Sequence, residues 1–168
     1  MASRIEHAVV TGATGMIGIA LTDYLLSQGA CVTALIRKGS KRAGRLSDRK
    51  GLKKIELDLT ELSKEEVLLS SGGIEQKQDV FFHLGWEGTF GDSRNDMDLQ
   101  NNNIRYTLDA VRLAARLGCQ VFVGAGSQAE YGRTEQKLTS ATPAFPENGY
   151  GIAKLAAGQM SRILCQSL

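Results

Sequence analysis

Residues 5–18 read IEHAVVTGATGMIG, a short apolar run that leads into three glycines, Gly12, Gly15 and Gly18. The run predicts a buried strand, and the apolar positions of residues 16–27 recur at helical spacing. Glycines between a strand and a helix let the chain turn sharply, let backbone approach a pyrophosphate, and let the helix pack closely. The helix N-terminus then favours phosphate groups. A tight turn without a ligand is the alternative, but strand, turn and helix together favour a phosphate site.

The rest of the chain continues this alternation of strands and helices. Further strands are expected at 31–36, 55–57, 79–83 and 120–123, and further helices at 61–69, 99–117 and from 150 to the end. The strands are continuously apolar, which is typical of a parallel sheet covered on both faces. We therefore predict a doubly wound α/β fold with right-handed crossovers and strand order 3-2-1-4-5.

Composition excludes several classes of protein. The 168 residues suit a single domain, and a net charge of +2 with 42% hydrophobic residues is ordinary for a globular chain. No apolar stretch is long enough for a signal peptide or a membrane span, so no membrane partner is expected. The three cysteines form no CxxC pair, and no His, Asp or Glu group has ligand spacing. We expect a cytoplasmic protein without a metal.

A basic segment follows the second predicted strand. Arg37 and Lys38 stand where an NAD-specific site usually has an acid that binds the ribose 2′-hydroxyl. Two cations there suit a 2′-phosphate and favour NADP, although a solvated surface pair that leaves NAD in use is the alternative. Residues 37–54 hold nine basic side chains and a single acid, Asp48. No aromatic residues interleave with them, so a loop that attracts an anionic cofactor is favoured over a nucleic-acid site.

The second chemical signal is YGIAK, with Tyr150 and Lys154 at positions i and i+4 on one helical face. An isolated phenol has a pKa of about 10, and a nearby ammonium stabilises the phenolate, which prepares it for proton exchange. Ser127 lies just after the fifth predicted strand. Two surface residues and a loop-capping serine are the structural alternatives.

TGATGMIG, Ser127 and YGIAK together resemble the extended short-chain dehydrogenase/reductase family, which includes nucleotide-sugar epimerases and dehydratases. The resemblance implies a Rossmann fold and hydride transfer between a nicotinamide and a carbon that bears a hydroxyl or ketone. Tyr150 would be the acid/base, Lys154 would tune it and bind the nicotinamide ribose, and Ser127 would hold the substrate oxygen.

The same resemblance assigns further cofactor contacts. Asp58 and Leu59 would meet the adenine, and Leu84, Gly85 and Trp86 would lie beside the riboses. Trp86 departs from the small residue usual there and would instead point into the substrate pocket. Asn103 would support the active site through hydrogen bonds. The expected cofactor set is Gly12, Thr14, Gly15, Met16, Ile17, Gly18, Arg37, Lys38, Asp58, Leu59, Leu84, Gly85, Trp86, Asn103, Tyr150 and Lys154.

The expected function is an NAD(P)-dependent epimerase/dehydratase-family oxidoreductase that acts on a nucleotide sugar. A dehydratase is disfavoured because residues 128–130 supply no acidic pair. An NADP-dependent reductase of a small carbonyl compound and a catalytically inert dinucleotide-binding module are the alternatives. The resemblance further implies that residues 1–168 are the N-terminal part of a longer enzyme whose C-terminal substrate domain is absent. It also implies a homodimer through helices 99–117 and 150 onward.

Overall fold

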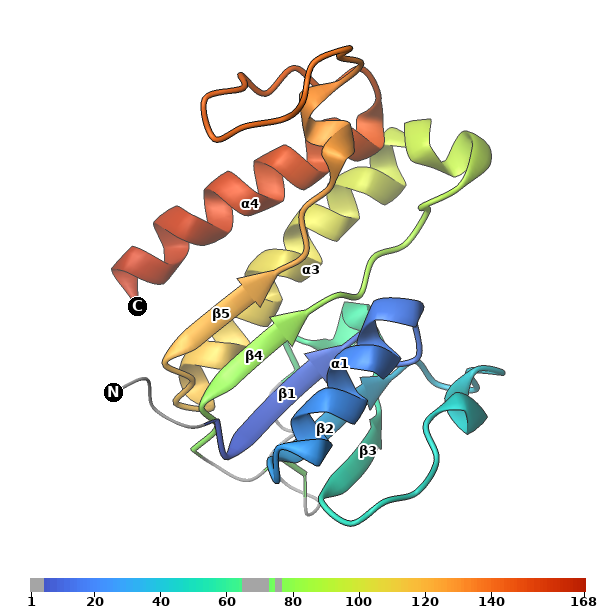
Figure 1. The fold of residues 1–168 in the computed structure, drawn as a ribbon, viewed down its shortest axis with the longest axis vertical. Coiled ribbons are helices and arrows are strands. Elements are labelled where there is room, and N and C mark those ends of the chain that lie inside the picture. The colour runs from blue at the N-terminus through green and yellow to red at the C-terminus, as the bar shows by residue number, and fades with distance from the viewer. Residues whose placement is uncertain (1–4, 65–72, 75–76) are drawn as a thin grey trace. The chain divides into compact units, whose positions relative to one another are not determined.

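A computed structural model describes residues 5–64, 73–74 and 77–168 (Figure 1). The chain divides into two compact units. Unit 1 comprises residues up to 85 and 109–124, and unit 2 comprises 86–108 and 125–168. Helix α3 (Met97–Arg116) contributes its first part to unit 2 and its last part to unit 1.

Unit 1 is built on a five-stranded parallel sheet. The strand order is β3-β2-β1-β4-β5, which confirms the predicted doubly wound topology. The strands are β1 (His7–Thr11), β2 (Cys31–Ile36), β3 (Leu52–Glu56), β4 (Val80–His83) and β5 (Val121–Gly124). In the register, Thr11 lies opposite Leu35 on one side and His83 on the other. The carboxyl ends of these three strands therefore meet at one edge of the sheet.

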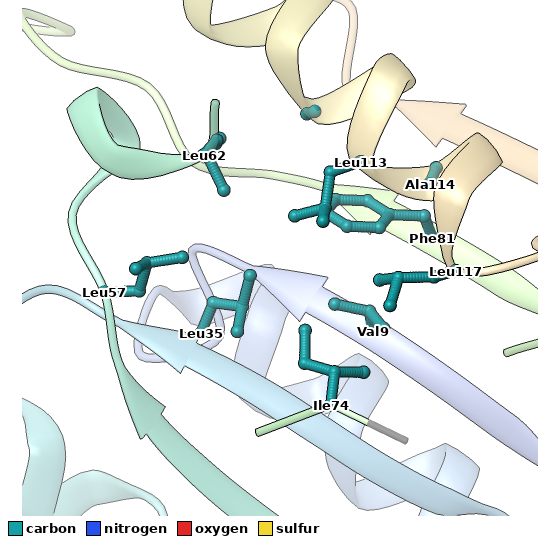
Figure 2. Packing of buried hydrophobic residues seen from close by; sticks show 10 residues of the cluster. Val9, Leu35, Leu57, Leu62, Ile74, Phe81, Leu113, Ala114 and Leu117 are labelled. Carbon is teal, nitrogen blue, oxygen red and sulfur yellow. The ribbon is translucent and has the colours of Figure 1, made fainter. Parts of the chain in front are cut away.

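Both faces of the three central strands β1, β2 and β4 are buried, as their apolar sequences predict, whereas the outer strand β5 exposes Val121 and Val123. Successive side chains of a strand point to opposite faces. Val9 accordingly joins a cluster with Phe81 of β4 and Leu113 of α3, which Figure 2 shows. Its neighbour Val10 joins a second cluster with Leu25 of α1 (Met16–Ser27). Two helical segments thus cover the sheet, and the burial of these apolar side chains stabilises unit 1.

Two of the expected elements differ from the structure. Strand β3 begins at Leu52, earlier than expected, and its polar residues Lys53 and Lys54 are accommodated because β3 is at the edge of the sheet. Of the helix expected at 61–69, the described part is the short 3₁₀ helix η2 (Leu59–Glu61) and a turn, and residues 65–69 lie outside the described residues. Another 3₁₀ helix, η1 (Ala43–Arg45), lies within the basic segment. Among the described residues, no helix has the length and apolar character to cross a membrane.

Unit 2 is helical. It holds the start of α3 and the helix α4 (Gly149–Ser167), which were predicted to within two residues. The 3₁₀ helices η3 (Gly91–Asn95) and η4 (Gln128–Tyr131) occupy segments that were expected to be loops. A Cβ at Gly151 would lie 2.9 Å from the carbonyl carbon of Ala129, so glycine lets α4 approach η4 closely. This contact fixes the start of α4, where Tyr150 lies.

Candidate functional site

The glycine turn connects β1 to α1 and has a shape that side chains would prevent. Gly12 has a φ of +66°, and a Cβ there would lie 2.7 Å from the backbone nitrogen of Gly85. A Cβ at Gly18 would lie 2.7 Å from the Cα of Ala13. Gly15 is the N-cap of α1. The first glycine therefore permits the turn, and the third permits the packing of the helix against it, as the spacing predicts.

The turn offers features that fit a dinucleotide. Within the described part of the chain, no side chain caps the first N–H groups of α1, and such groups with the helix dipole attract phosphate. Met16 and Ile17 are 85% and 66% exposed at the first turn of this helix, unusually open for apolar side chains. An anionic group with apolar neighbours would satisfy both features, so the residues present fit the expected cofactor.

The hydroxyl of Thr11 joins the ends of β1 and β4, a role that the sequence analysis did not identify. Its Oγ1 accepts from the backbone nitrogens of Leu84 and Gly85, each at 3.1 Å. It lies 3.0 Å from Nδ1 of His83, so its own proton is given to that nitrogen. The buried His83 thereby has a structural role at the end of β4. The network holds Leu84 and Gly85 beside the glycine turn.

The predicted adenine contacts lie at the same edge. A Cβ at Gly85 would be 3.0 Å from Cδ2 of Leu59, so the Leu59 side chain packs against Gly85. Asp58 directly precedes η2. Beyond the end of β2, Arg37 is exposed, whereas Lys38 is engaged by Glu61. Arg37 and Lys38 were expected to bind a 2′-phosphate together, but Lys38 is paired with a carboxylate whereas Arg37 is exposed.

Lys154 is the most strongly perturbed titratable group of unit 2. It is buried within α4, and its Nζ donates to the carbonyl oxygen of Ala125 at 2.8 Å. Burial lowers the pKa of Lys154 to about 8, although the charge of Glu130 opposes the shift. The Nζ also lies 5.9 Å from the ring centroid of Tyr150, so the structure brings the YGIAK pair together.

Trp86 covers this pair. The Nζ of Lys154 lies 3.7 Å from the centroid of its ring, a cation–π geometry. The Trp86 and Tyr150 rings meet edge to face, with centroids 6.0 Å apart. The Nε1 of Trp86 donates to Oε1 of Gln100 at 3.0 Å, which fixes the indole. The unusual tryptophan is thus a direct neighbour of both proposed catalytic residues.

Two buried amides on α3 hold the segment around Trp86. Asn103 exchanges hydrogen bonds with the backbone of Glu87, at 3.0 Å and 2.9 Å. Gln100 donates to the carbonyl oxygens of Gly88 and Ser93, each at 2.9 Å. The contacts of Asn103 agree with a supporting role, and its place among the cofactor contacts stays a prediction. The sequence analysis did not identify Gln100. Its position one helical turn before Asn103, on the same face of the helix, was the only signal that could have indicated its supporting role.

Ser127 is the N-cap of η4. Its Oγ accepts from the backbone nitrogen of Ala129 at 3.2 Å, and its backbone nitrogen donates to Oε1 of Glu130 at 2.6 Å. The capping role considered as the alternative is therefore present. It uses the oxygen of the hydroxyl as an acceptor, which leaves the hydroxyl proton for a substrate oxygen. Capping and substrate binding are compatible.

Arg94 was not identified from the sequence. Its guanidinium carbon lies 4.6 Å from the centroid of the Tyr150 ring, and among the described residues no carboxylate pairs with it. It also lines a cavity of about 320 Å³, together with η4 and Arg133. Arg133 is paired with Glu147 at 2.9 Å. Arg94 thus contacts the Tyr150 ring and also brings a positive charge to this cavity. The described residues contain no group of three potential metal ligands.

Comparisons with known proteins identify the family and the fold of the chain. The model of the NAD dependent epimerase/dehydratase family matches residues 8–167. The chain is 30% identical to a dTDP-6-deoxy-L-talose 4-dehydrogenase (NAD(+)) of Aggregatibacter actinomycetemcomitans, over 88% of this chain and 51% of that protein. A UDP-galactose 4-epimerase structure is 27% identical with a TM-score of 0.75, over 92% of this chain and 50% of that one.

The fold is also shared with the Bordetella bronchiseptica enzyme WbmG in complex with NAD. That structure is 18% identical with a TM-score of 0.77, and the match covers 96% of this chain and 50% of that one. The chain thus spans about half the length of the relatives that it matches.

Proposed function

We propose that this chain, which belongs to the NAD dependent epimerase/dehydratase family, binds a nicotinamide dinucleotide. The bound dinucleotide would take part in the oxidation or reduction of a nucleotide sugar. The reacting carbon would bear a hydroxyl or a ketone. Two relatives support this substrate class, because their names give a dTDP-6-deoxy sugar and UDP-galactose. The dehydrogenase is named for NAD(+), and the WbmG structure contains NAD.

The observation that carries the proposal is the side-chain arrangement around Tyr150 in unit 2. When bound, the dinucleotide supplies a hydride acceptor or donor. Tyr150 takes the proton of the sugar hydroxyl, or returns it, and Ser127 donates a hydrogen bond to the same oxygen. Lys154 places a positive charge near the phenol, and its bond to Ala125 with the Trp86 ring holds that charge in place.

The glycine turn supports dinucleotide binding in unit 1. Its backbone and the start of α1 would bind the pyrophosphate, and Met16 and Ile17 would cover it. Asp58, Leu59, Leu84 and Gly85 are proposed to contact the adenosine. The preference for NADP that Arg37 and Lys38 suggested has no support from the comparisons, because the dehydrogenase is named for NAD(+) and the WbmG structure is a complex with NAD.

We also propose two binding partners besides the cofactor, an anionic substrate and a second copy of the chain. Arg94 would attract an anionic part of the substrate to the cavity that it lines. A homodimer through α3 and α4 stays a prediction; on α4, Ile152, Met160 and Ile163 are exposed apolar residues that a second copy would cover.

The proposal is tested by Tyr150→Phe, with Tyr131→Phe as the matched control in the same unit. Removal of the Tyr150 hydroxyl should reduce turnover of UDP-galactose or dTDP-6-deoxy-L-talose about a hundredfold or more. Calorimetric binding of NAD should stay nearly the same. Tyr131→Phe should preserve both properties. Equal turnover in Tyr150→Phe and wild type would remove Tyr150 from the reaction, and NAD binding without turnover in wild type would favour an inert dinucleotide-binding module.

A further inference from the structure

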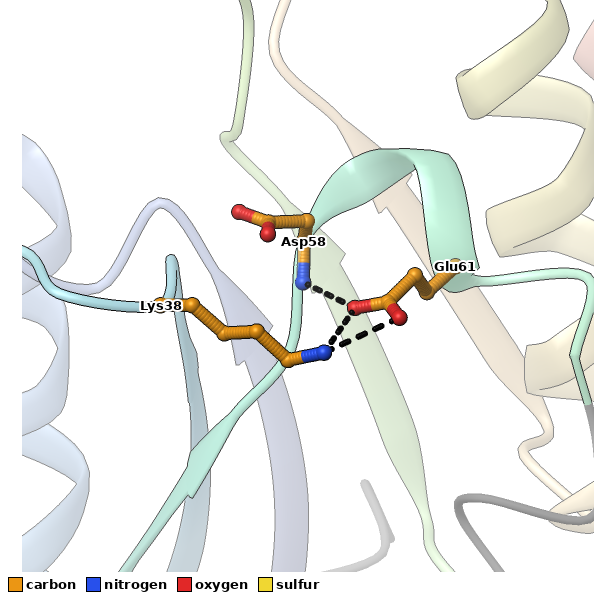
Figure 3. A network of polar contacts seen from close by, with 3 residues as sticks. All are labelled: Lys38, Asp58 and Glu61. Atoms are coloured by element: carbon orange, nitrogen blue, oxygen red, sulfur yellow. Dashed lines mark hydrogen bonds and ion pairs between the residues drawn. The ribbon is translucent and has the colours of Figure 1, made fainter.

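An ion pair lies just beyond the end of β2. The Nζ of Lys38 is 2.9 Å from Oε2 of Glu61 and 3.0 Å from Oε1, as Figure 3 shows. Glu61 also accepts from the backbone nitrogen of Asp58 at 3.4 Å. The Glu61 side chain is only 16% exposed, whereas that of Lys38 is 52% exposed. The carboxylate is therefore held in place from both sides, by the segment after β2 and by the start of η2.

The position of this pair coincides with the expected place of the adenosine ribose. Strands β1 and β2 are parallel neighbours, with Thr11 opposite Leu35. The glycine turn follows Thr11, and Arg37 and Lys38 follow the last residue of β2, so both segments leave the same edge of the sheet. In Rossmann sites, the residue at the end of the second strand meets the ribose 2′ position. Glu61 brings a carboxylate to this place from a different strand connection.

The charges of the pair oppose a 2′-phosphate. The hydrogen bond to Glu61 raises the pKa of Lys38, and the same bond lowers the pKa of Glu61, so both groups are charged at neutral pH. The positive charge of Lys38 is thereby largely neutralised. Arg37 is left as an exposed cation, for which no carboxylate partner occurs among the described residues. A 2′-phosphate would meet the Glu61 carboxylate beside the two cations, Arg37 and Lys38, and the two negative groups would repel each other, whereas a 2′-hydroxyl could donate to the carboxylate.

We propose that Glu61 is a specificity-determining residue, which makes this site select NAD over NADP despite the Arg37-Lys38 sequence. The inference rests on the proposed function, because it requires that the chain bind a nicotinamide dinucleotide. It revises the expectation that Lys38 grips a 2′-phosphate. Glu61 has the role that an acid at the end of β2 has in other NAD sites, but it reaches the position from η2.

Glu61→Gln tests this proposal without removing the local cap. The amide oxygen of glutamine can still accept from the backbone nitrogen of Asp58, but the negative charge is lost and Lys38 is released. The dissociation constants for NAD and NADP are measured by calorimetry for wild type and variant. The ratio of NADP affinity to NAD affinity should rise about tenfold or more in Glu61→Gln, equivalent to about 1.4 kcal/mol.

Asp48→Asn is the matched control. Asp48 pairs with Lys54 at 2.7 Å within the same unit, so its substitution breaks another lysine–carboxylate pair and changes the net charge equally. The affinity ratio should then stay at the wild-type value. Lys38→Gln should shift the ratio in the opposite direction to Glu61→Gln, because it leaves the Glu61 carboxylate unneutralised.

Three results would overturn the inference. A wild-type preference for NADP would contradict it directly. Binding of NAD with the same affinity ratio in Glu61→Gln and Asp48→Asn would remove Glu61 from cofactor selection, while the proposed function would stand. Binding of neither dinucleotide by wild type would overturn the proposed function and this inference together.

Discussion

The two units depend on different kinds of structure for their proposed roles. In unit 1 the candidate cofactor site consists mainly of backbone: a glycine turn, a helix N-terminus and two residues after β4. In unit 2 the candidate catalytic site consists of packed side chains, with the Trp86 ring against both Tyr150 and Lys154. The spacing of the glycines in the sequence indicates the backbone shape of the turn. Side-chain packing depends on contacts between residues far apart in the chain, so it becomes visible only in the structure.

The comparison predicts that the largest effects come from adding atoms to the turn. Gly12→Ala places a methyl group 2.7 Å from the backbone of Gly85, in a residue with a φ of +66°. Overpacking and strain should lower the free energy of unfolding by about 3 kcal/mol and abolish NAD binding. Gly44→Ala is the control, because a Cβ there meets no atom within 4 Å. Chemical denaturation should show a change of about 0.5 kcal/mol or less for that control.

An effect of similar size should appear in the pH dependence of stability, and it concerns unit 2. The folded state lowers the pKa of Lys154 from 10.5 to about 8, so between these values the unfolded chain alone binds the proton. Stability from this group therefore rises as the pH increases through this range, by about 3 kcal/mol. The rise is measured as the difference between wild type and Lys154→Met in urea titrations. Lys41→Met, at an exposed lysine, should keep the wild-type profile.

A smaller effect is expected at the cavity that Arg94 lines, where we propose that the substrate binds. Arg94→Gln removes the charge beside Tyr150, and the KM for the nucleotide sugar should rise about tenfold, while NAD affinity stays unchanged. Arg133→Gln is matched to it, because Arg133 lines the same cavity but is already paired with Glu147. Equal KM values in the two variants would show that the unneutralised charge of Arg94 has no role in substrate binding.

The smallest effect separates the ring of Trp86 from its hydrogen bond. Trp86→Phe keeps an aromatic face for Lys154 but loses the bond to Gln100. The free energy of unfolding should fall by about 1 kcal/mol. Trp86→Ala also loses the cation–π contact and should be clearly less stable than Trp86→Phe. Similar stability of the two variants would mean that the ring contributes little to holding Lys154.

The sequence predicted the fold well because local patterns determined it. Continuous apolar runs identified the parallel strands, and the helix spacing identified α1, α3 and α4. The start of β3 was wrong, since an edge strand tolerates Lys53 and Lys54 and so lacks the apolar pattern. The roles predicted for Gly12 and Gly18 agree with the structure because the conformation of Gly12 and the close packing at Gly18 exclude other residues.

The candidate site was predicted only in part. Short-range sequence patterns identified Tyr150, Lys154 and Ser127. The contacts of Gln100, Arg94 and Thr11 join residues that are distant in the chain, so no local pattern indicated them. The pairing of Lys38 with Glu61 is of the same kind, because 23 positions separate the two residues in the chain. Because Glu61 offsets the charge of Lys38, the Arg37-Lys38 pair contributes about one positive charge at this place instead of two.

The central claim is that the glycine turn of unit 1 binds a nicotinamide dinucleotide. It is tested most directly by calorimetric titration of NAD into the 168-residue chain, with Gly12→Ala and Gly44→Ala measured in parallel. The account predicts saturable binding to wild type and Gly44→Ala and none to Gly12→Ala. Absence of binding to the folded wild-type chain, or equal binding to all three, would contradict it.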